Sequence, residues 1–176
     1  MKKIILSDQD FKDVIIRISD EIIKDQRNIN NLALVGIQTR GDFLAKRLAK
    51  QIEKIKKIAI PVGSMDINMY RDDWSQISYQ PIVRPSNIPF KVDEMDIILV
   101  DDVLFTGRTV RAAIDSLMDF GRPSVIKLAI IIDRGYRELP IQPDYKGIAI
   151  NTDKNDMINV FVKEHDKKDG VYIETK

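Results

Sequence analysis

The chain contains 176 residues, which corresponds to one domain at roughly 150 residues per domain. Its 28 Lys and Arg residues almost balance its 27 Asp and Glu residues, so the net charge of +1 gives no overall attraction for nucleic acid. The absence of Cys excludes disulfides and Cys-bound zinc, and the single His165 argues against a Ser-His-Asp hydrolase. No apolar run approaches the roughly 18 residues of a membrane span, and we expect a cytoplasmic protein with a single domain over residues 1–176.

The first third of the chain predicts a helix, a strand and a second helix. Ser7 followed by Asp10 resembles a capping box at a helix start. Apolar residues then recur at helical spacing, at Phe11, Val14, Ile15, Ile18 and Ile22. Residues 32–37 (LALVGI) form a continuous apolar run, which is typical of a strand buried on both faces, and an apolar stripe predicts a helix over 42–56.

The middle of the chain is less regular. Short strands are predicted over 58–62 and, from weak alternation, over 65–70. Residues 71–93 contain three Pro residues and little periodicity, which indicates a long surface loop. Long loops inside compact domains are often lids, so we expect a flexible loop over the site, with an excursion that has no role as the alternative. Trp74 lies in this segment and either packs the loop down or contacts a partner.

The second half again alternates strands and helices. A strand is predicted over 97–100, a helix over 109–120 that ends at Gly121, and a long apolar strand over 125–132. Short strands are expected over 148–150, 158–162 and 171–173. This alternation predicts an α/β fold with a mainly parallel central sheet and helices on both faces.

Three of the predicted strands end in polar turns that contain Gly or acidic residues, at 38–41, 101–109 and 133–135. Ligands of open α/β sheets bind beyond the carboxyl ends of the strands, so we expect these three turns to share one edge of the sheet. In the central turn, Thr106, Gly107, Arg108 and Thr109 lie at a helix start, where free N–H groups favour a phosphate.

Asp101 and Asp102 precede that turn and would repel a phosphate bound alone. Carboxylates accept hydrogen bonds from a sugar diol and also suit Mg²⁺, so the combined pattern indicates a ribose 5-phosphate. If both residues stay in strand geometry, only one can reach the pocket, whereas both can do so if the strand breaks there. A receiver domain and a capped helix beside a solvated acid pair are the alternative interpretations.

The segment VDDVLFTGRT resembles the phosphoribosyl pyrophosphate (PRPP) motif of type I phosphoribosyltransferases. Together with LVGIQTRGDFLAKRLA, MDINMYRDD and IIDRGYRELPIQPDY, it is similar in order and spacing to the PyrR family, which combines pyrimidine operon attenuation with uracil phosphoribosyltransferase activity. The resemblance runs from about residue 6 to beyond residue 145. It implies the type I phosphoribosyltransferase fold, a small hood formed by the terminal segments, and a homodimer or larger homo-oligomer.

The resemblance also implies a place for each part of PRPP. The 5-phosphate and the ribose would lie on the PRPP motif, formed by Asp101, Asp102, Val103, Leu104, Phe105, Thr106, Gly107, Arg108 and Thr109. The acid pair would contact the ribose hydroxyls, and the Thr-flanked turn would hold the phosphate. Thr39, Arg40 and Gly41 would hold the pyrophosphate.

The remaining roles fall on two further segments. Arg71, Asp72 and Asp73 would open the loop that closes over the site. Asp133 would reach Mg²⁺, bound with PRPP, through water, Arg134 would contact the pyrophosphate, and Tyr136 would help to wall the uracil site. The predicted catalytic residues are Asp101, Asp102, Arg40 and Asp133, and the expected reaction converts uracil and PRPP to UMP and pyrophosphate.

The family also binds a stem-loop in pyrimidine-operon leader RNA, which requires cations that neutralise phosphates. The family commonly has His, His and Arg where this chain has Asp20, Tyr136 and Gln142. Cations that could compensate are Arg17, Lys24, Arg27 and Arg137. Three functions therefore stay open: an enzyme that also regulates in response to UMP, an RNA-binding nucleotide sensor with little turnover, and a phosphoribosyltransferase for a purine base.

Overall fold

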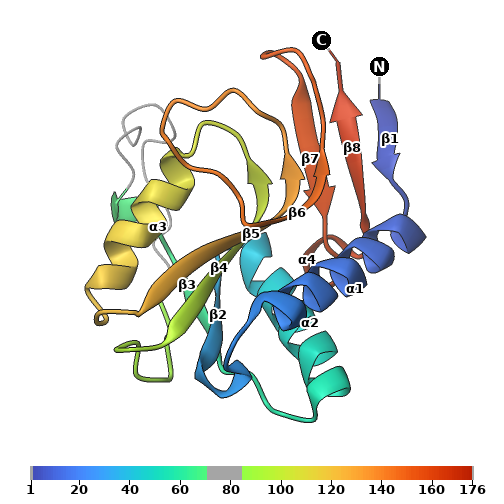
Figure 1. Ribbon diagram of the computed structural model, residues 1–176. Helices are drawn as coiled ribbons and strands as arrows, with labels where there is room; N and C mark the ends of the chain where they lie inside the picture. Colours follow the sequence, from blue (N-terminus) through green and yellow to red (C-terminus); the bar gives the residue numbers. More distant parts are fainter. Residues whose placement is uncertain (1, 71–84, 176) are drawn as a thin grey trace.

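A computed structural model describes residues 2–70 and 85–175 as two sheets and their flanking helices (Figure 1). The main sheet has the order β3-β2-β4-β5-β6, and every neighbouring pair in it is parallel. Its strands are β2 (Leu32–Ile37), β3 (Val62–Met65), β4 (Asp96–Leu104), β5 (Val125–Asp133) and β6 (Tyr145–Ala149). The predicted α/β fold with a parallel central sheet is confirmed.

Helices cover both faces of this sheet. α1 (Asp8–Asp25) and α2 (Arg40–Lys56) lie on one face and α3 (Arg108–Met118) on the other (Figure 1). Alternate residues of β2 supply two separate cores: Leu32 and Leu34 pack with α1 and α2, whereas Ala33 and Val35 belong to the core under α3. Burial on both faces explains why the strand sequence is apolar throughout.

α1 begins where the sequence predicts. Ser7 and Asp10 form a capping box in which each side chain accepts from the other residue's backbone N–H. The five apolar residues of its predicted stripe are all buried, with Phe11, Ile18 and Ile22 fully enclosed.

The terminal segments form the second sheet, which stands beyond one end of the main sheet (Figure 1). β1 (Lys2–Leu6) and β7 (Met157–Phe161) both pair antiparallel with β8 (Gly170–Glu174). The short helix α4 (Lys163–Asp166) connects β7 to β8. We call β1, β7, α4 and β8 the hood. The sequence of β1 has no strong local pattern that predicts a strand. β1 is held by its pairing with β8, at the other end of the chain.

Two of the predicted strands are wrong. The strand expected over 58–62 starts only at Val62, because Pro61 has no N–H for a ladder. The strand expected over 65–70 ends at Met65 and is followed by the 3₁₀-helix η2 (Asn68–Tyr70). The Asp66 carboxylate accepts from the Asn68 N–H at 2.9 Å, and this local bond turns the chain away from the sheet. A second 3₁₀-helix, η1 (Ile29–Asn31), precedes β2.

Candidate active site

The three turns predicted to meet do lie at one edge of the main sheet. β2, β4 and β5 are parallel neighbours, so the segments 38–41, 101–109 and 133–135 all lie at their carboxyl ends. The turn after β4 contacts the turn after β5 directly, because the Leu104 carbonyl accepts from the Arg134 N–H at 3.0 Å.

Two glycines allow α2 to begin directly against the sheet. A Cβ atom on Gly36 would lie 2.3 Å from the Gly41 carbonyl oxygen, and one on Gly41 would lie 2.3 Å from the Val100 carbonyl oxygen. Larger residues would therefore push the helix start away from β2 and β4. The peptide bond that leads into this turn, between Gln38 and Thr39, is cis. The close packing brings Arg40, the first residue of α2, within electrostatic range of Asp102.

Both members of the acid pair lie within β4, which runs on to Leu104 rather than ending at residue 100. β2 pairs with β4 only as far as Val100, so the N–H groups that follow lack β2 as a partner. Each carboxylate accepts from the N–H of the residue that follows it: Asp101 Oδ1 accepts from the Asp102 N–H at 2.9 Å, and Asp102 Oδ1 accepts from the Val103 N–H at 2.8 Å. The pairing of β4 with β2 thus ends at the residue before the acids.

Strict alternation of side chains does not continue across the pair. Ile98 and Val100 pack in the core beneath α1 and α2, as even-numbered residues of β4. Val103 packs against the same core although its number is odd, and Leu104 belongs to the core under α3. The pairing with β5 continues in register through Leu104. The register with β5 is thus the same before and after Asp102, while the side-chain alternation changes at the acids. Strand geometry alone therefore does not force the two carboxylates apart.

The two carboxylates have different surroundings. Asp101 is buried, with 7% of its surface exposed, and Asp102 is partly buried. Burial raises the pKa of Asp102, and the guanidinium of Arg40 opposes that shift. A carboxylate whose charged form is poorly solvated gains by accepting hydrogen bonds, and a sugar diol supplies two such donors.

The turn after β4 has the geometry of an anion site. Gly107 is the N-cap of α3 and has φ +95°, in the left-handed region that favours glycine. No acidic residue lies in the first turn of α3, so no carboxylate of this turn competes with an anion at the helix start. The Thr106 hydroxyl accepts from the Arg108 N–H at 3.3 Å and closes the turn. Backbone N–H groups are thereby grouped around the start of the helix.

A segment that follows β5 supports this turn from outside, and sequence reasoning missed its role. The Thr106 carbonyl accepts from the Glu138 N–H at 2.9 Å, and Arg108 Nε donates to Glu138 Oε2 at 2.7 Å. The Arg108 side chain therefore ties the two segments together. The motif RELP was visible in the sequence as a family feature, but no local pattern pairs it with residues some 30 positions earlier.

Arg137, expected to contact RNA, is enclosed in the same support. Its guanidinium donates to the carbonyls of Phe105, Gly135 and Ile141 at 2.9–3.1 Å and to Asp133 Oδ1 at 2.6 Å. Only 13% of its side chain is exposed. The guanidinium of Arg137 thus forms its hydrogen bonds with the turns around the pocket, and little of it is left exposed for RNA.

Asp133 lies at the end of β5 and is also buried. Its hydrogen bonds within the described residues, from Arg137 and the Gly135 N–H, both fall on Oδ1. Oδ2 is left to accept from water, which fits the predicted indirect contact with Mg²⁺. No group of three or more acidic or His side chains that could hold a metal exists in the described part of the chain. The residues present therefore suit a Mg²⁺ ion that substrate phosphates help to hold, rather than a cage built by protein alone.

Phe105, Arg134 and Tyr136 form a wall beside these turns. The Arg134 guanidinium lies 4.0 Å from the centre of the Phe105 ring, and one of its nitrogens donates to the carbonyls of Asp153, Lys154 and Asp156. Tyr136 meets the Phe105 ring edge-on, and its hydroxyl donates to the Thr152 carbonyl at 2.6 Å. Arg134 thus belongs to this wall, and its contact with pyrophosphate stays a prediction.

The other residues expected to bind RNA differ in exposure. Arg17 donates to Glu21 and to the carbonyls of Lys146 and Gly147, so it ties α1 to β6. Arg27 is exposed near the end of α1. Asp20 is partly buried and Gln142 is exposed.

Arg71, Asp72, Asp73 and Trp74 lie outside the described residues, as does most of the predicted loop over 71–93. Their roles stay predictions. None of the helices within 2–70 and 85–175 has the length and apolar character needed to cross a membrane.

Comparison with known proteins identifies the family of the chain. The model of the phosphoribosyl transferase domain family matches residues 1–167. A bifunctional protein PyrR from Desulfosudis oleivorans is 50% identical over 172 residues, which cover 97% of this chain and 95% of the relative. A bifunctional protein PyrR from Syntrophobacter fumaroxidans is 48% identical over 98% of this chain and 92% of its own length.

Solved structures share the fold at low identity. A hypoxanthine-guanine phosphoribosyltransferase from Bacillus anthracis superimposes with a TM-score of 0.74 at 13% identity, over 99% of this chain and 98% of the other. A hypoxanthine phosphoribosyltransferase from Staphylococcus aureus gives a TM-score of 0.70 at 19% identity, over 99% and 92% of the two chains. The fold is therefore that of the phosphoribosyltransferases. With the sequence identity to its relatives, this places the chain in the PyrR family of type I phosphoribosyltransferases.

Proposed function

We propose that the protein is a uracil phosphoribosyltransferase that converts uracil and PRPP to UMP and pyrophosphate. A bond forms between uracil N1 and the anomeric carbon of the ribose, and the bond from that carbon to the pyrophosphate oxygen breaks. The N1 proton of uracil is lost to solvent. Membership of the PyrR family supports uracil as the base.

One observation supports this chemistry above the others: an acid pair, a helix start without acids and an arginine lie together at the carboxyl edge of the sheet. We assign the ribose hydroxyls to Asp101 and Asp102 and the 5-phosphate to the turn 106–109. Arg40 and the start of α2 would receive the pyrophosphate, with Thr39 and Gly41 beside it. In such a site, carboxylates accept from the ribose hydroxyls, whereas backbone N–H groups and a guanidinium donate to the negatively charged phosphates.

Bond breakage leaves positive charge on the sugar ring and negative charge on the pyrophosphate. Asp101 and Asp102 would fix the diol and face the positive ring, and Arg40 would stabilise the leaving group. Electrostatic groups of this kind are each worth about 10²–10³ in rate when they are lost. Mg²⁺ bound with PRPP would neutralise part of the pyrophosphate charge, with Asp133 within reach through water.

The direct test is a base-competition assay with PRPP and Mg²⁺. We expect UMP formation with uracil, and a value of kcat/KM for hypoxanthine or guanine that is lower by at least a factor of about 10³, because a site that reads the edge of one base leaves its polar groups unpaired with another. Preferred turnover of a purine base would contradict the assignment of uracil.

We also propose that the protein binds pyrimidine-operon leader RNA in response to UMP, since the relatives are bifunctional PyrR proteins. The exposed cations at the end of α1, Lys24 and Arg27, are the candidate contacts. A filter-binding titration at low salt should show saturable binding that UMP changes and that Arg27→Gln weakens. Absence of saturable binding would leave an enzyme without this second role.

A further inference from the structure

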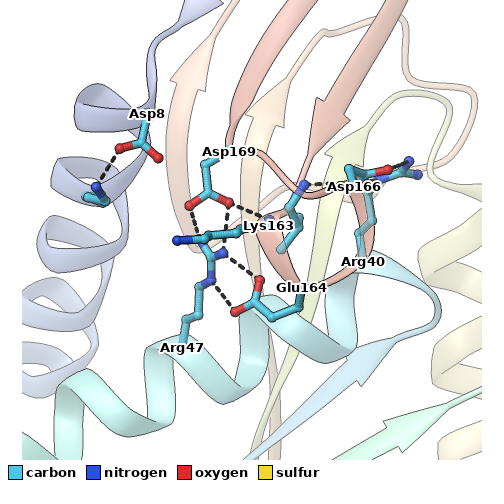
Figure 2. Close-up of polar contacts among 9 residues, drawn as sticks. Asp8, Arg40, Arg47, Lys163, Glu164, Asp166 and Asp169 are labelled. Carbon is cyan, nitrogen blue, oxygen red and sulfur yellow. Dashed lines mark hydrogen bonds and ion pairs between the residues drawn. The ribbon is translucent and has the colours of Figure 1, made fainter.

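Two arginine side chains of α2 form ion pairs with acidic residues of the hood or beside it. Arg40 and Arg47 are seven residues apart, about two helical turns, so they project from the same side of the helix. Arg40 Nε and Nη2 donate to the two carboxylate oxygens of Asp166, each at 3.0 Å (Figure 2). Arg47 donates to Glu164 and Asp169, which lie before and after Asp166 in the sequence. The hood is thereby fastened to the helix that begins at the candidate pyrophosphate site.

Asp166 is the fixed partner in its pair. Its Oδ2 also accepts from the Val162 N–H at 2.8 Å, and only 13% of its side chain is exposed. The segment that carries it is anchored by Arg47, which donates to both oxygens of Glu164 and of Asp169. Asp169 in turn accepts from the Lys163 N–H at 2.7 Å (Figure 2). With its carboxylate held by the backbone, Asp166 determines where the guanidinium of Arg40 lies.

The orientation of Arg40 leaves part of it available. Asp166 occupies the edge formed by Nε and Nη2, and Nη1 makes no hydrogen bond to any residue within 2–70 or 85–175. About a third of the Arg40 side chain is exposed. The guanidinium also interacts with the charge of Asp102, so it lies between the hood and the acid pair. An anion at the start of α2 would find a nitrogen donor already held in place.

We propose that Asp166 is a positioning residue for the leaving-group side of the site: it fixes Arg40 so that Nη1 donates to the pyrophosphate group of PRPP. The inference rests on the proposed function, and it assigns the hood a part in substrate binding. Because the bidentate contact uses one edge of the guanidinium only, the pyrophosphate adds to Asp166 as a second partner of Arg40.

The test compares two substitutions in the same short helix. Asp166→Asn removes the bidentate acceptor of Arg40, whereas Glu164→Gln removes one carboxylate from Arg47 and leaves Arg40 untouched. Binding of PRPP and of pyrophosphate is measured by calorimetry with Mg²⁺, alongside KM for each substrate. We expect Asp166→Asn to raise both dissociation constants and the KM for PRPP about five- to tenfold, with KM for uracil unchanged. Because Arg47 keeps both of its hydrogen bonds to Asp169, Glu164→Gln should match the wild type in all of these.

A double-mutant cycle separates positioning from general loosening of the hood. If Asp166 acts through Arg40, then Asp166→Asn should change PRPP binding no further in a chain that already carries Arg40→Ala. Asp166→Glu keeps the carboxylate on a side chain that is longer by one methylene group, and it should weaken PRPP binding less than Asp166→Asn does.

Three results would overturn the proposal: equal effects of Asp166→Asn and Glu164→Gln, tighter PRPP binding by Asp166→Asn, or an effect that persists without Arg40. The proposed function fails separately. If the wild type binds PRPP but forms no UMP, the transferase assignment is wrong, while the binding comparison still decides the role of Asp166.

Discussion

Asp102 combines burial with a charge that the proposed chemistry uses. Its pKa is raised by burial above the ordinary value of 3.8, so the folded state holds a proton more firmly than the unfolded chain. Stability therefore falls as pH rises through the interval between those two pKa values, and at neutral pH the ionised form carries that cost. The carboxylate is kept at the expense of stability, as expected for a group that meets substrate.

Asp102→Asn should separate activity from stability. The amide oxygen still accepts from the Val103 N–H, and the partly buried charge is gone, so we expect the melting temperature at pH 7 to stay level or rise. Turnover of uracil and PRPP should fall at least about 10²-fold. Thermal unfolding and steady-state kinetics on the same preparation check this. If Asp102→Asn keeps the turnover of the wild type, Asp102 does not contact the substrate as assigned.

Arg137 shows the opposite case, a cation that supports the site without facing substrate. Replacing it with Met leaves the buried Asp133 carboxylate without its ion pair and frees three carbonyls, so we expect a loss of about 3 kcal/mol in the free energy of unfolding. Arg27→Met, at an exposed position, is the matched control and should change stability little. Urea denaturation measures both, and equal small effects would show that Arg137 is free to meet another partner.

At the scale of elements, the start of α2 depends on its close contact with the sheet. Gly41→Ala places a methyl group 2.3 Å from the Val100 carbonyl oxygen, where neither backbone can move without shifting the helix. We expect a loss of about 1–3 kcal/mol in stability together with weaker PRPP binding. Lys50→Ala, an exposed position on the same helix, controls for helix propensity, and a Gly41→Ala variant that binds PRPP normally would contradict the assigned place of the helix start.

Most elements could be predicted because their signals are local. The stripe of α1, the apolar runs of β2 and β5 and the glycine at the start of α3 each appear within a few residues of sequence. The elements that could not be predicted depend on a distant or a competing contact. β1 forms a strand only by pairing with β8, and the Asp66 carboxylate accepts a local hydrogen bond where the sequence predicts that the strand continues. The residues that hold the site from behind, Glu138 and Asp166, were missed for the same reason.

For the whole molecule, the attachment of the hood should weaken in acid. The hydrogen bond from Arg47 is the largest influence on the pKa of Glu164 and lowers it below its ordinary value of 4.5. A lowered carboxyl pKa contributes stability above the unfolded value, and that contribution is lost as pH falls through the folded value. We expect unfolding free energy to drop as pH falls from about 5 to 3, and Glu164→Gln to reduce that drop.

Urea unfolding at several pH values follows this change. Glu53→Gln, on the exposed side of α2, serves as the control and should keep the wild-type dependence on pH. A wild-type stability that is flat down to pH 3, or a Glu164→Gln variant with an unchanged profile, would show that the ion pair contributes nothing to holding the hood.

The most direct measurement is a crystal structure of the protein soaked with UMP. We expect the nucleotide phosphate to lie on the N–H groups of the turn 106–109 and the ribose hydroxyls to donate to Asp101 or Asp102. A phosphate bound at another edge of the sheet, or a ribose remote from both carboxylates, would contradict it.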